Sequence, residues 1–423
     1  MESQLKLQIG KNNVQIELKP YKLELRNPFG TAHSLTTERT NGLVSVQIDN
    51  VIGYGECGLP PKKPYCYLAD YNDIDIYFKS FIQTCKDRID RSLDNKYDPF
   101  NSLPNQYFTN LRPSNNSTSE YSTFYYLFEC LDECTLNSMD YSHPARSSIE
   151  MALLDAWGKF LKLPIYKMIK NDCDNVEKKP FYYTVSLCPT MEEILKSSDF
   201  GTKHTLYLKI KFDQDIDKCM NILWSVLNQL NPQRICKLSI DANSSWTPEI
   251  ALKYLTRLVP LSHVISMVEQ PFPIELLKGD NPHRNEQLQQ WRDVKKQYES
   301  EGLSIFADES VSSQKDIPDL LPLVHGVNVK LEKSGGLRSA LSTILKAQES
   351  KLGIWIGCMV ASSLNVSCAC HLLSLFSDLG GDLDGGLLIN DETQLFTNDA
   401  FLVVDHGLVD LQNNNNGIGV LLK

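Results

Sequence analysis

The fold of this chain can be worked out from the stretch Leu206-Tyr207-Leu208-Lys209-Ile210-Lys211-Phe212. The stretch has the composition of a strand, in which residues i and i+2 point to the same face. Lys209 and Lys211 therefore project side by side, and each ammonium disfavours the charge of the other. Such a strand either faces solvent or lowers the pKa of a lysine that is used as a base. The segments that follow indicate which.

Four apolar segments later in the chain each end in one charged residue. Residues 238–240 precede Asp241, residues 264–268 precede Glu269, residues 303–307 precede Asp308, and residues 327–329 precede Lys330. Stretches with helical periodicity separate them. These stretches include Ile216, Met220, Leu223, Leu227 and Leu230 at steps of three and four, Ile250, Tyr254 and Leu258 at steps of four after an N-cap at Thr247-Pro248, and residues 338–345 after a Gly335-Gly336 turn. Repeated strand–helix units predict parallel β/α architecture, and seven or more of them close into a (β/α) barrel.

The carboxyl ends of the strands of such a barrel form one mouth, where catalytic residues gather. Three carboxylates that converge there repel one another unless a cation neutralises them, and all-oxygen ligation suits Mg²⁺. Zinc would prefer histidine or cysteine, but the eight histidines have no HExxH or paired spacing, and no cysteine pair has zinc-finger spacing. The sequence therefore predicts a Mg²⁺ site made by Asp241, Glu269 and Asp308.

The ordered set of motifs resembles the enolase superfamily and, within it, the muconate-lactonising-enzyme subgroup. The motifs are Lys209-x-Lys211, Asp241-Ala242-Asn243, Glu269-Gln270-Pro271, Asp308-Glu309-Ser310 and Lys330-Leu331-x-Lys333-x-Gly335-Gly336. Gly357-Cys358-Met359 with Ala361-Ser362-Ser363, and Asp382-Leu383-Asp384-Gly385, look like the seventh and eighth strand ends of dipeptide epimerases. Residues 53–56 and 146–166 resemble the family's capping domain and the helix that leads into its barrel, and residues 417–420 resemble its closing strand.

The resemblance implies a role for each matched position. Lys211 and Lys330 would be the catalytic acid/base pair, with Mg²⁺ stabilising an ene-diolate, as is known for enolase-superfamily sites. The substrate would be contacted by Thr184, Lys209, Cys358, Met359, Asp382, Asp384 and Phe29. Two departures from the family pattern lie near the substrate: Gly386 replaces a frequent proline, and Val360-Ala361 replaces an acidic position of some members. They leave the metal chemistry intact and affect side-chain specificity.

Two lysines on opposite faces of a planar intermediate allow one to remove a proton and the other to return it, which inverts a stereocentre. A dehydratase or cycloisomerase needs only one base. Asp382 and Asp384 lie two apart, so on a strand they would share a face and could bind a substrate ammonium. We therefore expect an isomerase, a Mg²⁺-dependent epimerase acting on the C-terminal residue of an L-Ala-L-Xaa-like dipeptide.

Two alternatives remain open. An o-succinylbenzoate synthase or N-acylamino-acid racemase acts on substrates without a free ammonium, so Asp382 and Asp384 would be dispensable. A non-catalytic scaffold or binding protein on the same fold would not need the lysines or the metal. The unusual insertion described below is the feature that motivates the scaffold alternative.

The sequence also carries an expectation about specificity. Residues 27–34 form a predicted loop that closes over the barrel mouth, and Phe29 within it could line an apolar wall for the epimerised side chain or pack in the core of the cap. This loop contains no arginine or lysine, although Arg26 precedes it and Arg39 follows it. We therefore expect apolar or aromatic C-terminal residues to be preferred over glutamate.

Three regions are expected along the chain. Residues 1–178 form an α+β capping domain with a polar insertion at about 88–143, residues 179–393 form a modified (β/α)7β TIM-type barrel, and residues 394–423 return to the cap. The insertion has one apolar segment, residues 123–131, which could pack on the core or on a partner subunit. A homo-oligomer is compatible with the sequence.

Composition excludes several other classes. A chain of 423 residues with net charge −10 has no basic face for nucleic acid. Twelve dispersed cysteines and the lack of an apolar N-terminal segment predict a cytoplasmic protein with reduced thiols. Residues 352–376 lack Lys, Arg, Asp and Glu, but polar side chains interrupt them, so a strand and a buried helix are expected rather than a membrane span. The remaining partner is a small-molecule substrate.

A glycine motif at residues 53–58 has the GxGxxG form of a dinucleotide site. That site needs a helix to begin at the turn, and Pro60, Pro61 and Pro64 exclude one. We interpret the glycines instead as a tight turn in a loop over the barrel mouth.

Overall fold

The computed structural model describes residues 3–89, 97–112, 121–136, 143–173, 176–229, 237–278, 282–397, 400–411 and 416–423. Part of the predicted insertion, including residues 90–96, 113–120 and 137–142, lies outside the described residues, as does Leu230.

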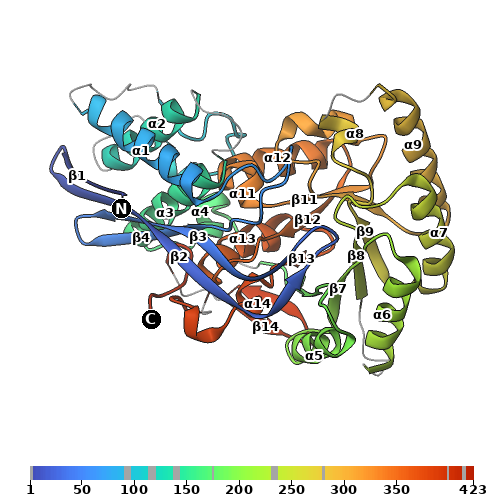
Figure 1. The fold of residues 1–423 in the computed structure, drawn as a ribbon. Coiled ribbons are helices and arrows are strands. Elements are labelled where there is room, and N and C mark those ends of the chain that lie inside the picture. Colours follow the sequence, from blue (N-terminus) through green and yellow to red (C-terminus); the bar gives the residue numbers. More distant parts are fainter. Residues whose placement is uncertain are drawn as a thin grey trace.

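Eight strands form one parallel sheet in the order β13-β12-β11-β10-β9-β8-β7-β6 (Figure 1). They are β6 (Tyr182–Val185), β7 (Tyr207–Lys211), β8 (Lys237–Asp241), β9 (Ile265–Glu269), β10 (Ile305–Ala307), β11 (Gly326–Val329), β12 (Gly353–Gly357) and β13 (Gly381–Asp382). A parallel bridge between Phe181 and Gly381 joins the two edge strands. The sheet is therefore closed, and the predicted barrel is confirmed.

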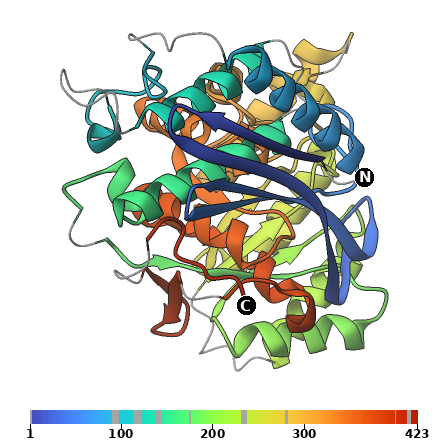
Figure 2. The same cartoon turned by 90° about the vertical axis from the view of Figure 1, so that its left-hand side faces the viewer.

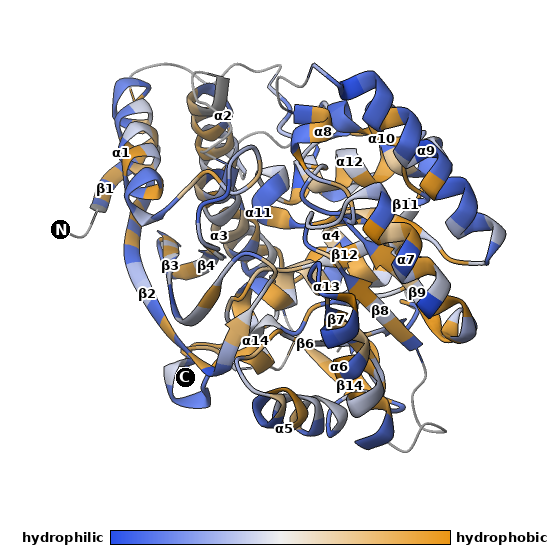
Figure 3. Ribbon diagram, turned by 45° about the vertical axis from the view of Figure 1, so that its right-hand side comes forward, coloured by the Kyte–Doolittle hydropathy of each residue, from blue (hydrophilic) through white to orange (hydrophobic). Residues whose placement is uncertain are grey.

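Helices follow the strands and cover the outside of the barrel. They are α5 (Met191–Thr202), α6 (Ile216–Gln229), α7 (Pro248–Leu258), α8 (Glu275–Lys278), α9 (Arg284–Ser300), α10 (Ile317–Leu320), α11 (Leu331–Ser334), α12 (Leu337–Glu349), α13 (Ser363–Phe376) and α14 (Gly385–Leu388). Thr247 caps α7 as expected, since its side chain accepts a hydrogen bond from the Ile250 amide. Figure 3 shows α9 as a mainly hydrophilic helix on the outside of the barrel, whereas strand β8 further inside is mainly hydrophobic. Strand β12 and buried helix α13 confirm the interpretation of residues 352–376, and no helix in the described part of the chain combines the length and hydropathy needed to cross a bilayer.

Large side chains fill the barrel interior below its mouth. Tyr182, Met267, Phe306 and Trp355 form a separate buried cluster, contributed by β6, β9, β10 and β12. The ring centroids of Tyr182 and Trp355 lie 4.6 Å apart. Because the interior is packed in this way, only the carboxyl ends of the strands are open to a ligand.

The cap combines an antiparallel sheet with helices. Its strands are β1 (Ser3–Ile9), β2 (Asn12–Gly30), β3 (Leu35–Ile48) and β4 (Val51–Cys57), and its helices are α1 (Tyr71–Asp87), η1 (Thr109–Leu111), α2 (Ser122–Leu136), α3 (His143–Leu161) and α4 (Ile165–Ile169). Figure 2 shows the sheet in front of these helices.

Two of the three glycines of the GxGxxG motif lie in this sheet. Gly53 and Gly55 are in β4, where a Cβ would come within 2.1 Å of the Ala152 carbonyl oxygen and 1.9 Å of the Ser148 carbonyl oxygen of α3. The expected turn is wrong: the glycines allow a strand and a helix to touch. No helix begins at the motif itself, since the next helix, α1, begins at Tyr71.

The apolar segment of the insertion packs within the cap. Phe124 of α2 stacks on Trp157 of α3, with ring centroids 4.9 Å apart and planes at 6°. Asp132 of the same helix pairs with Arg338 of α12 at 2.8 Å. The described part of the insertion therefore contributes to the core and ties the cap to the barrel.

The C-terminal residues contact both parts of the molecule. Strands β14 (Phe401–Val404) and β15 (Leu408–Leu411) form a small sheet with β5 (Lys179–Pro180) beside the barrel. The Ile418 amide then donates to Asp155 of α3 at 2.8 Å, which brings the tail back to the cap. Residues 417–420 form an isolated bridge at Gly417 and no strand, which corrects the expected closing strand.

Candidate active site

A cavity of about 460 Å³ lies between the barrel mouth and the cap. Ten of the predicted site residues line it: Phe29, Thr184, Lys209, Lys211, Asp308, Lys330, Cys358, Met359, Asp382 and Asp384. Asp241 and Glu269 are not in its lining, although both are almost fully buried beneath it. The strand ends thus deliver their charged residues to one place, as the barrel geometry requires.

Lys209 lies among three carboxylates. Its Nζ is 3.0 Å from Asp241, 2.7 Å from Glu269 and 2.8 Å from Asp382. Burial disfavours the ammonium, but the three acids outweigh burial and raise the pKa of Lys209 well above its usual value. Lys209 is therefore a fixed cation, and it separates Asp241 and Glu269 from the cavity.

Lys211 projects from the same face of β7, as the i, i+2 spacing predicts. Its Nζ donates to Asp241 Oδ2 at 2.8 Å and to Asn243 Oδ1 at 2.9 Å. The same nitrogen lies 5.6 Å from the centre of the Phe29 ring, in cation–π range. The two adjacent lysines share Asp241 Oδ2, and Lys209 also pairs with Glu269 and Asp382, so the repulsion between the two ammonium groups is offset.

Lys330 follows β11 and donates to Asp308 Oδ2 at 2.8 Å. Asp308 also pairs with Lys333, and the two ammonium groups outweigh burial and hold the pKa of Asp308 well below its usual value. Strands β7 and β11 are four steps apart in an eight-stranded closed sheet. Lys211 and Lys330 therefore reach the cavity from opposite walls.

The three predicted metal ligands come from the adjacent strand ends of β8, β9 and β10. Within the described residues, no three acidic, histidine or cysteine side chains are already gathered closely enough to hold an ion. Glu269 Oε2 is buried and makes no hydrogen bond, although it is near Lys209, and burial raises the pKa of Glu269 to about 8. A set of buried carboxylate oxygens, one of which makes no hydrogen bond, fits a hard divalent cation.

Asp382 and Asp384 differ in their surroundings. Strand β13 ends at Asp382, so the expectation that both lie on one strand is wrong. Asp382 is occupied by Lys209 and by the Trp355 indole N–H at 2.5 Å. Asp384 instead accepts from the Thr184 backbone amide at 2.5 Å, and burial together with Asp382 raises its pKa to about 6. Both line the cavity, and Asp384 is the acid without a lysine partner in the described residues.

Cys358 and Met359 also line the cavity, each 8% exposed. The Cys358 thiol donates to the Asp382 carbonyl at 3.3 Å, and burial raises its pKa well above the usual value, so the sulfur is a neutral thiol. Phe29 lies in β2, next to the hairpin turn, rather than in a free loop.

Several lining residues were not expected from the sequence. They are His33, Arg39, Lys63, Asn243 and Glu309. Asn243 has a left-handed backbone with φ 45°, which brings its side chain to Lys211 and its carbonyl to His33 and Lys63 at 2.7 and 3.1 Å. An Asp-x-Asn sequence gives a weak signal for such a turn. His33 lies in the loop at residues 27–34 that was expected to close over the mouth, although no role was assigned to it, whereas Arg39 of β3 has no local signal because the barrel strands are far away in sequence.

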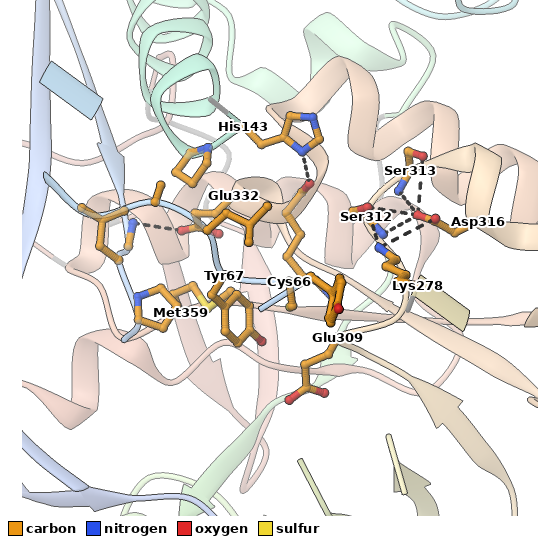
Figure 4. Close-up of a pocket in the computed structure, with 18 of the residues that line it drawn as sticks. Cys66, Tyr67, His143, Lys278, Glu309, Ser312, Ser313, Asp316, Glu332 and Met359 are labelled. Carbon is orange, nitrogen blue, oxygen red and sulfur yellow. Dashed lines mark hydrogen bonds and ion pairs between the residues drawn. The ribbon is translucent and has the colours of Figure 1, made fainter. Parts of the chain in front are cut away.

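A second cavity of about 650 Å³ lies beside the loop at residues 58–69 (Figure 4). Most of its polar groups hold one another: His143 contacts the Lys333 carbonyl at 2.8 Å, the Gly58 amide donates to Glu332 at 3.2 Å, and Asp316 accepts from Ser312 and Ser313. These contacts position the loop and α11 against each other. Pro60, Tyr67, Glu309 and Met359 line both cavities, so the loop is the partition between them.

Comparison with known proteins agrees with this geometry. Residues 204–423 match the family model for enolase C-terminal domain-like proteins. The chain is 56% identical over 98% of both sequences to an enolase superfamily member from Dictyostelium discoideum, and 27% identical to an L-Ala-D/L-Glu epimerase from Bacteroides thetaiotaomicron, over 95% of this chain and 86% of the relative. Its fold matches a dipeptide epimerase from Enterococcus faecalis, solved with Mg and L-Leu-L-Tyr, with TM-score 0.68 and 20% identity over 96% of this chain and 98% of the other.

Proposed function

The chain belongs to the enolase superfamily, and we propose that it is an epimerase that inverts the α-carbon of the C-terminal residue of a dipeptide. The observation that carries this proposal is the pair Lys211 and Lys330, which reach one cavity from opposite walls of the barrel. A planar intermediate held between them can lose a proton to one lysine and regain it from the other. Inversion of a stereocentre needs both lysines, whereas a dehydration or cycloisomerisation needs one.

Removal of a proton beside a carboxylate produces a dianionic ene-diolate, which needs strong electrostatic stabilisation. When held by Asp241, Glu269 and Asp308, Mg²⁺ would supply that positive charge. The chain's own contribution is a set of fixed cations: Lys209 stays charged among its three carboxylates and adds positive potential where the substrate carboxylate would lie. The packed barrel interior below excludes water from that side of the cavity.

Proton transfer requires that one lysine be neutral and the other charged. The Lys211 and Lys330 ammonium groups each donate to a carboxylate, so both are positioned by a hydrogen bond rather than free to rotate. Asn243 holds Lys211 in addition, and it leaves the ammonium directed toward the cavity. This preorganisation limits the motion needed for the proton to pass between the lysine nitrogen and the α-carbon.

A dipeptide supplies a second charged group, its α-ammonium. Asp384 suits that group because it is buried, lines the cavity and has no lysine partner among the described residues. Asp382 supports it indirectly by holding Lys209. Thr184 positions Asp384 through its backbone amide. An N-acylamino-acid racemase would not need this acid, so Asp384 favours a dipeptide over an N-acylated amino acid.

The test is proton exchange on single lysine variants in D₂O. With Mg²⁺ and a panel of L-Ala-L-Xaa dipeptides, the native enzyme should incorporate one deuterium at the C-terminal α-carbon and form both epimers. Lys211→Ala and Lys330→Ala should each abolish epimerisation, and one of them can retain exchange with retention of configuration. Normal epimerisation by both variants would refute the assignment.

A scaffold without catalysis predicts a different result. It would bind no Mg²⁺ in a calorimetric titration at millimolar concentration and would exchange no α-proton of any dipeptide. Substitution of Glu269 by Gln is the matched control, because it should weaken the binding of the metal to the native site.

A further inference from the structure

The Arg39 guanidinium lies in the wall of the candidate active site without a counter-ion. Arg39 is 8% exposed and lines the cavity from β3 of the cap. Its Nε has no hydrogen-bond partner, and Nη1 donates to the carbonyl of the neighbouring Glu38 at 3.3 Å. Within the described ranges, no carboxylate lies within ion-pair distance of it.

An unpaired buried cation is costly, because burial removes its hydration and nothing replaces it. Burial lowers the pKa of Arg39 to about 10, and no neighbouring acid offsets that effect. Other arginines of the fold are paired: Arg338 with Asp132 and Glu150, and Arg26 with Asp391. Arg39 is therefore the arginine that fits an anion supplied from outside the chain.

The neighbouring cations of the cap do not take that role. Lys62 pairs with Asp70 and Asp73 at 2.8 and 2.7 Å, and Lys63 donates to the Asn243 carbonyl at 3.1 Å and lies 3.4 Å from Glu309. On the barrel side, Lys209, Lys211 and Lys330 are held by carboxylates. The cap wall thus offers one planar, bidentate cation, a geometry that matches a carboxylate.

We propose that Arg39 binds a second carboxylate of the substrate, apart from the α-carboxylate at the reacting carbon. This inference rests on the proposed epimerase function and specifies its substrate class. The second carboxylate is the acidic side chain of the dipeptide. The free acid of a dicarboxylic N-acyl group such as succinyl has the same chemistry, and a preference for it would instead favour the N-acylamino-acid alternative. This proposal departs from the apolar preference expected from the sequence, which rested on Phe29 and on a loop without arginine or lysine, because Arg39 beyond that loop lines the cavity without a counter-ion.

Isosteric substrate pairs test the proposal. L-Ala-L-Glu is compared with L-Ala-L-Gln, and N-succinyl-L-alanine with N-butyryl-L-alanine, for kcat/KM in the native enzyme with Mg²⁺. We expect an acid preference of about 10- to 100-fold in one pair, the usual range for a charged hydrogen bond. The pair that shows it identifies the source of the carboxylate.

Variants then assign the preference to Arg39. In Arg39→Met the preference should fall to near unity, chiefly through KM, and Arg39→Lys should recover part of it. Arg26→Met is the matched control, since Arg26 is paired with Asp391 away from the cavity lining, and it should leave the ratio unchanged. Equal kcat/KM within both native pairs, or a preference that persists in Arg39→Met, would overturn the proposal.

Failure of the proposed function is distinguishable from failure of this inference. If no substrate is turned over, the epimerase assignment fails, and the Arg39 proposal is still decided by calorimetric binding of L-Ala-L-Glu against L-Ala-L-Gln and of N-succinyl- against N-butyryl-L-alanine. A tighter acid member that loses its advantage in Arg39→Met supports the site, whereas equal affinity within both pairs refutes it.

Discussion

At the barrel mouth, the neighbours of a residue determine its role more than its amino-acid type does. Asp382 and Asp384 have the same side chain and lie two apart, yet Lys209 and Trp355 bind the first while Thr184 donates to the second. The sequence predicted that both lie near the substrate, and the structure places both at the cavity. The sequence could not predict which of the two carboxylates remains available to a ligand, because the groups that bind Asp382 come from the distant strands β7 and β12.

The Asp384 environment leads to a prediction. Asp384→Asn removes the charge and keeps the acceptor for the Thr184 amide, so the fold should be unaffected. We expect kcat/KM for L-Ala-L-Xaa dipeptides to fall by about 10- to 100-fold through loss of a charged contact to the α-ammonium. The measurement is steady-state epimerisation by the native enzyme and the variant.

N-acetylation of the same dipeptides is the control, because it removes the ammonium. An acetylated dipeptide should be a poor substrate for both proteins and should show little difference between them. An equal loss on free and acetylated dipeptides would mean that Asp384 acts on the fold of the site and not on the ammonium.

Glu56 offers a residue-scale prediction about pH. Its carboxylate accepts hydrogen bonds from Asn41 at 2.8 Å and from the Ser362 amide, and burial raises its pKa to about 7. Because the folded-state pKa is above the unfolded value, the protonated form stabilises the fold. This contribution is complete below the unfolded pKa and is lost as pH rises to about 7.

Glu56→Gln mimics the protonated acid, so it should remove this loss. The variant should match the native protein near pH 4 and gain stability relative to it as pH rises toward 7, by about 3 kcal/mol from the linkage of pKa and stability. Thermal unfolding at several pH values measures it. A difference that is constant with pH would contradict the assignment.

Helices and strands were predicted where their signals are local. The N-cap at Thr247, the periodicity of α6 and the apolar strands β8, β9 and β11 are all encoded in a few neighbouring residues. Gly53 and Gly55 were assigned to a turn because the sequence does not show that α3 packs against them. The prediction of a closing strand at residues 417–420 was wrong for a related reason. Backbone groups of this segment form hydrogen bonds with residues of the cap, such as Asp155, rather than with a neighbouring strand.

Helix α7 provides a test at this scale. Thr247→Ala removes the side-chain acceptor of the Ile250 amide, and loss of an N-cap costs about 1 kcal/mol. The free energy of unfolding should fall by that amount, with epimerase activity unchanged at low temperature. Urea unfolding monitored by circular dichroism measures the change.

Thr256→Ala in the same helix is the matched control. Thr256 is exposed and its hydroxyl donates to the Leu252 carbonyl, a contact that does not satisfy a free helix end. Because alanine has the higher helix propensity, this variant should be as stable as the native protein or slightly more stable. A loss equal to that of Thr247→Ala would show that the cap is not the cause.

The whole molecule joins cap and barrel through buried charges. Arg338 of α12 donates to Glu150 of α3 at 2.8 Å and to Asp132 of α2; Arg338 and Glu150 are almost fully buried, whereas the Asp132 side chain is partly exposed. Removal of Arg338 leaves Arg146 as the remaining cation beside Asp132 and Glu150, and breaking a buried ion network costs about 3–5 kcal/mol. The cap and the barrel should therefore unfold together.

Arg338→Met tests this coupling. We expect a large fall in the unfolding temperature and separation of one calorimetric transition into two. Arg257→Met is the control, since Arg257 forms an exposed pair with Asp217 on the barrel surface, and it should change neither. A single unshifted transition in Arg338→Met would contradict the proposed role of the network.

The composition of the cavity wall has a consequence for how this enzyme could be altered. Phe29, Arg39 and Lys63 come from the cap, whereas the two lysines proposed to transfer protons come from barrel strands more than 100 residues later. Substitutions in the cap can therefore change the residues that contact the substrate side chain without changing the barrel residues. A chimera that carries the β2–β3 hairpin of a relative should have the substrate specificity of the donor and the stereochemical outcome of the recipient.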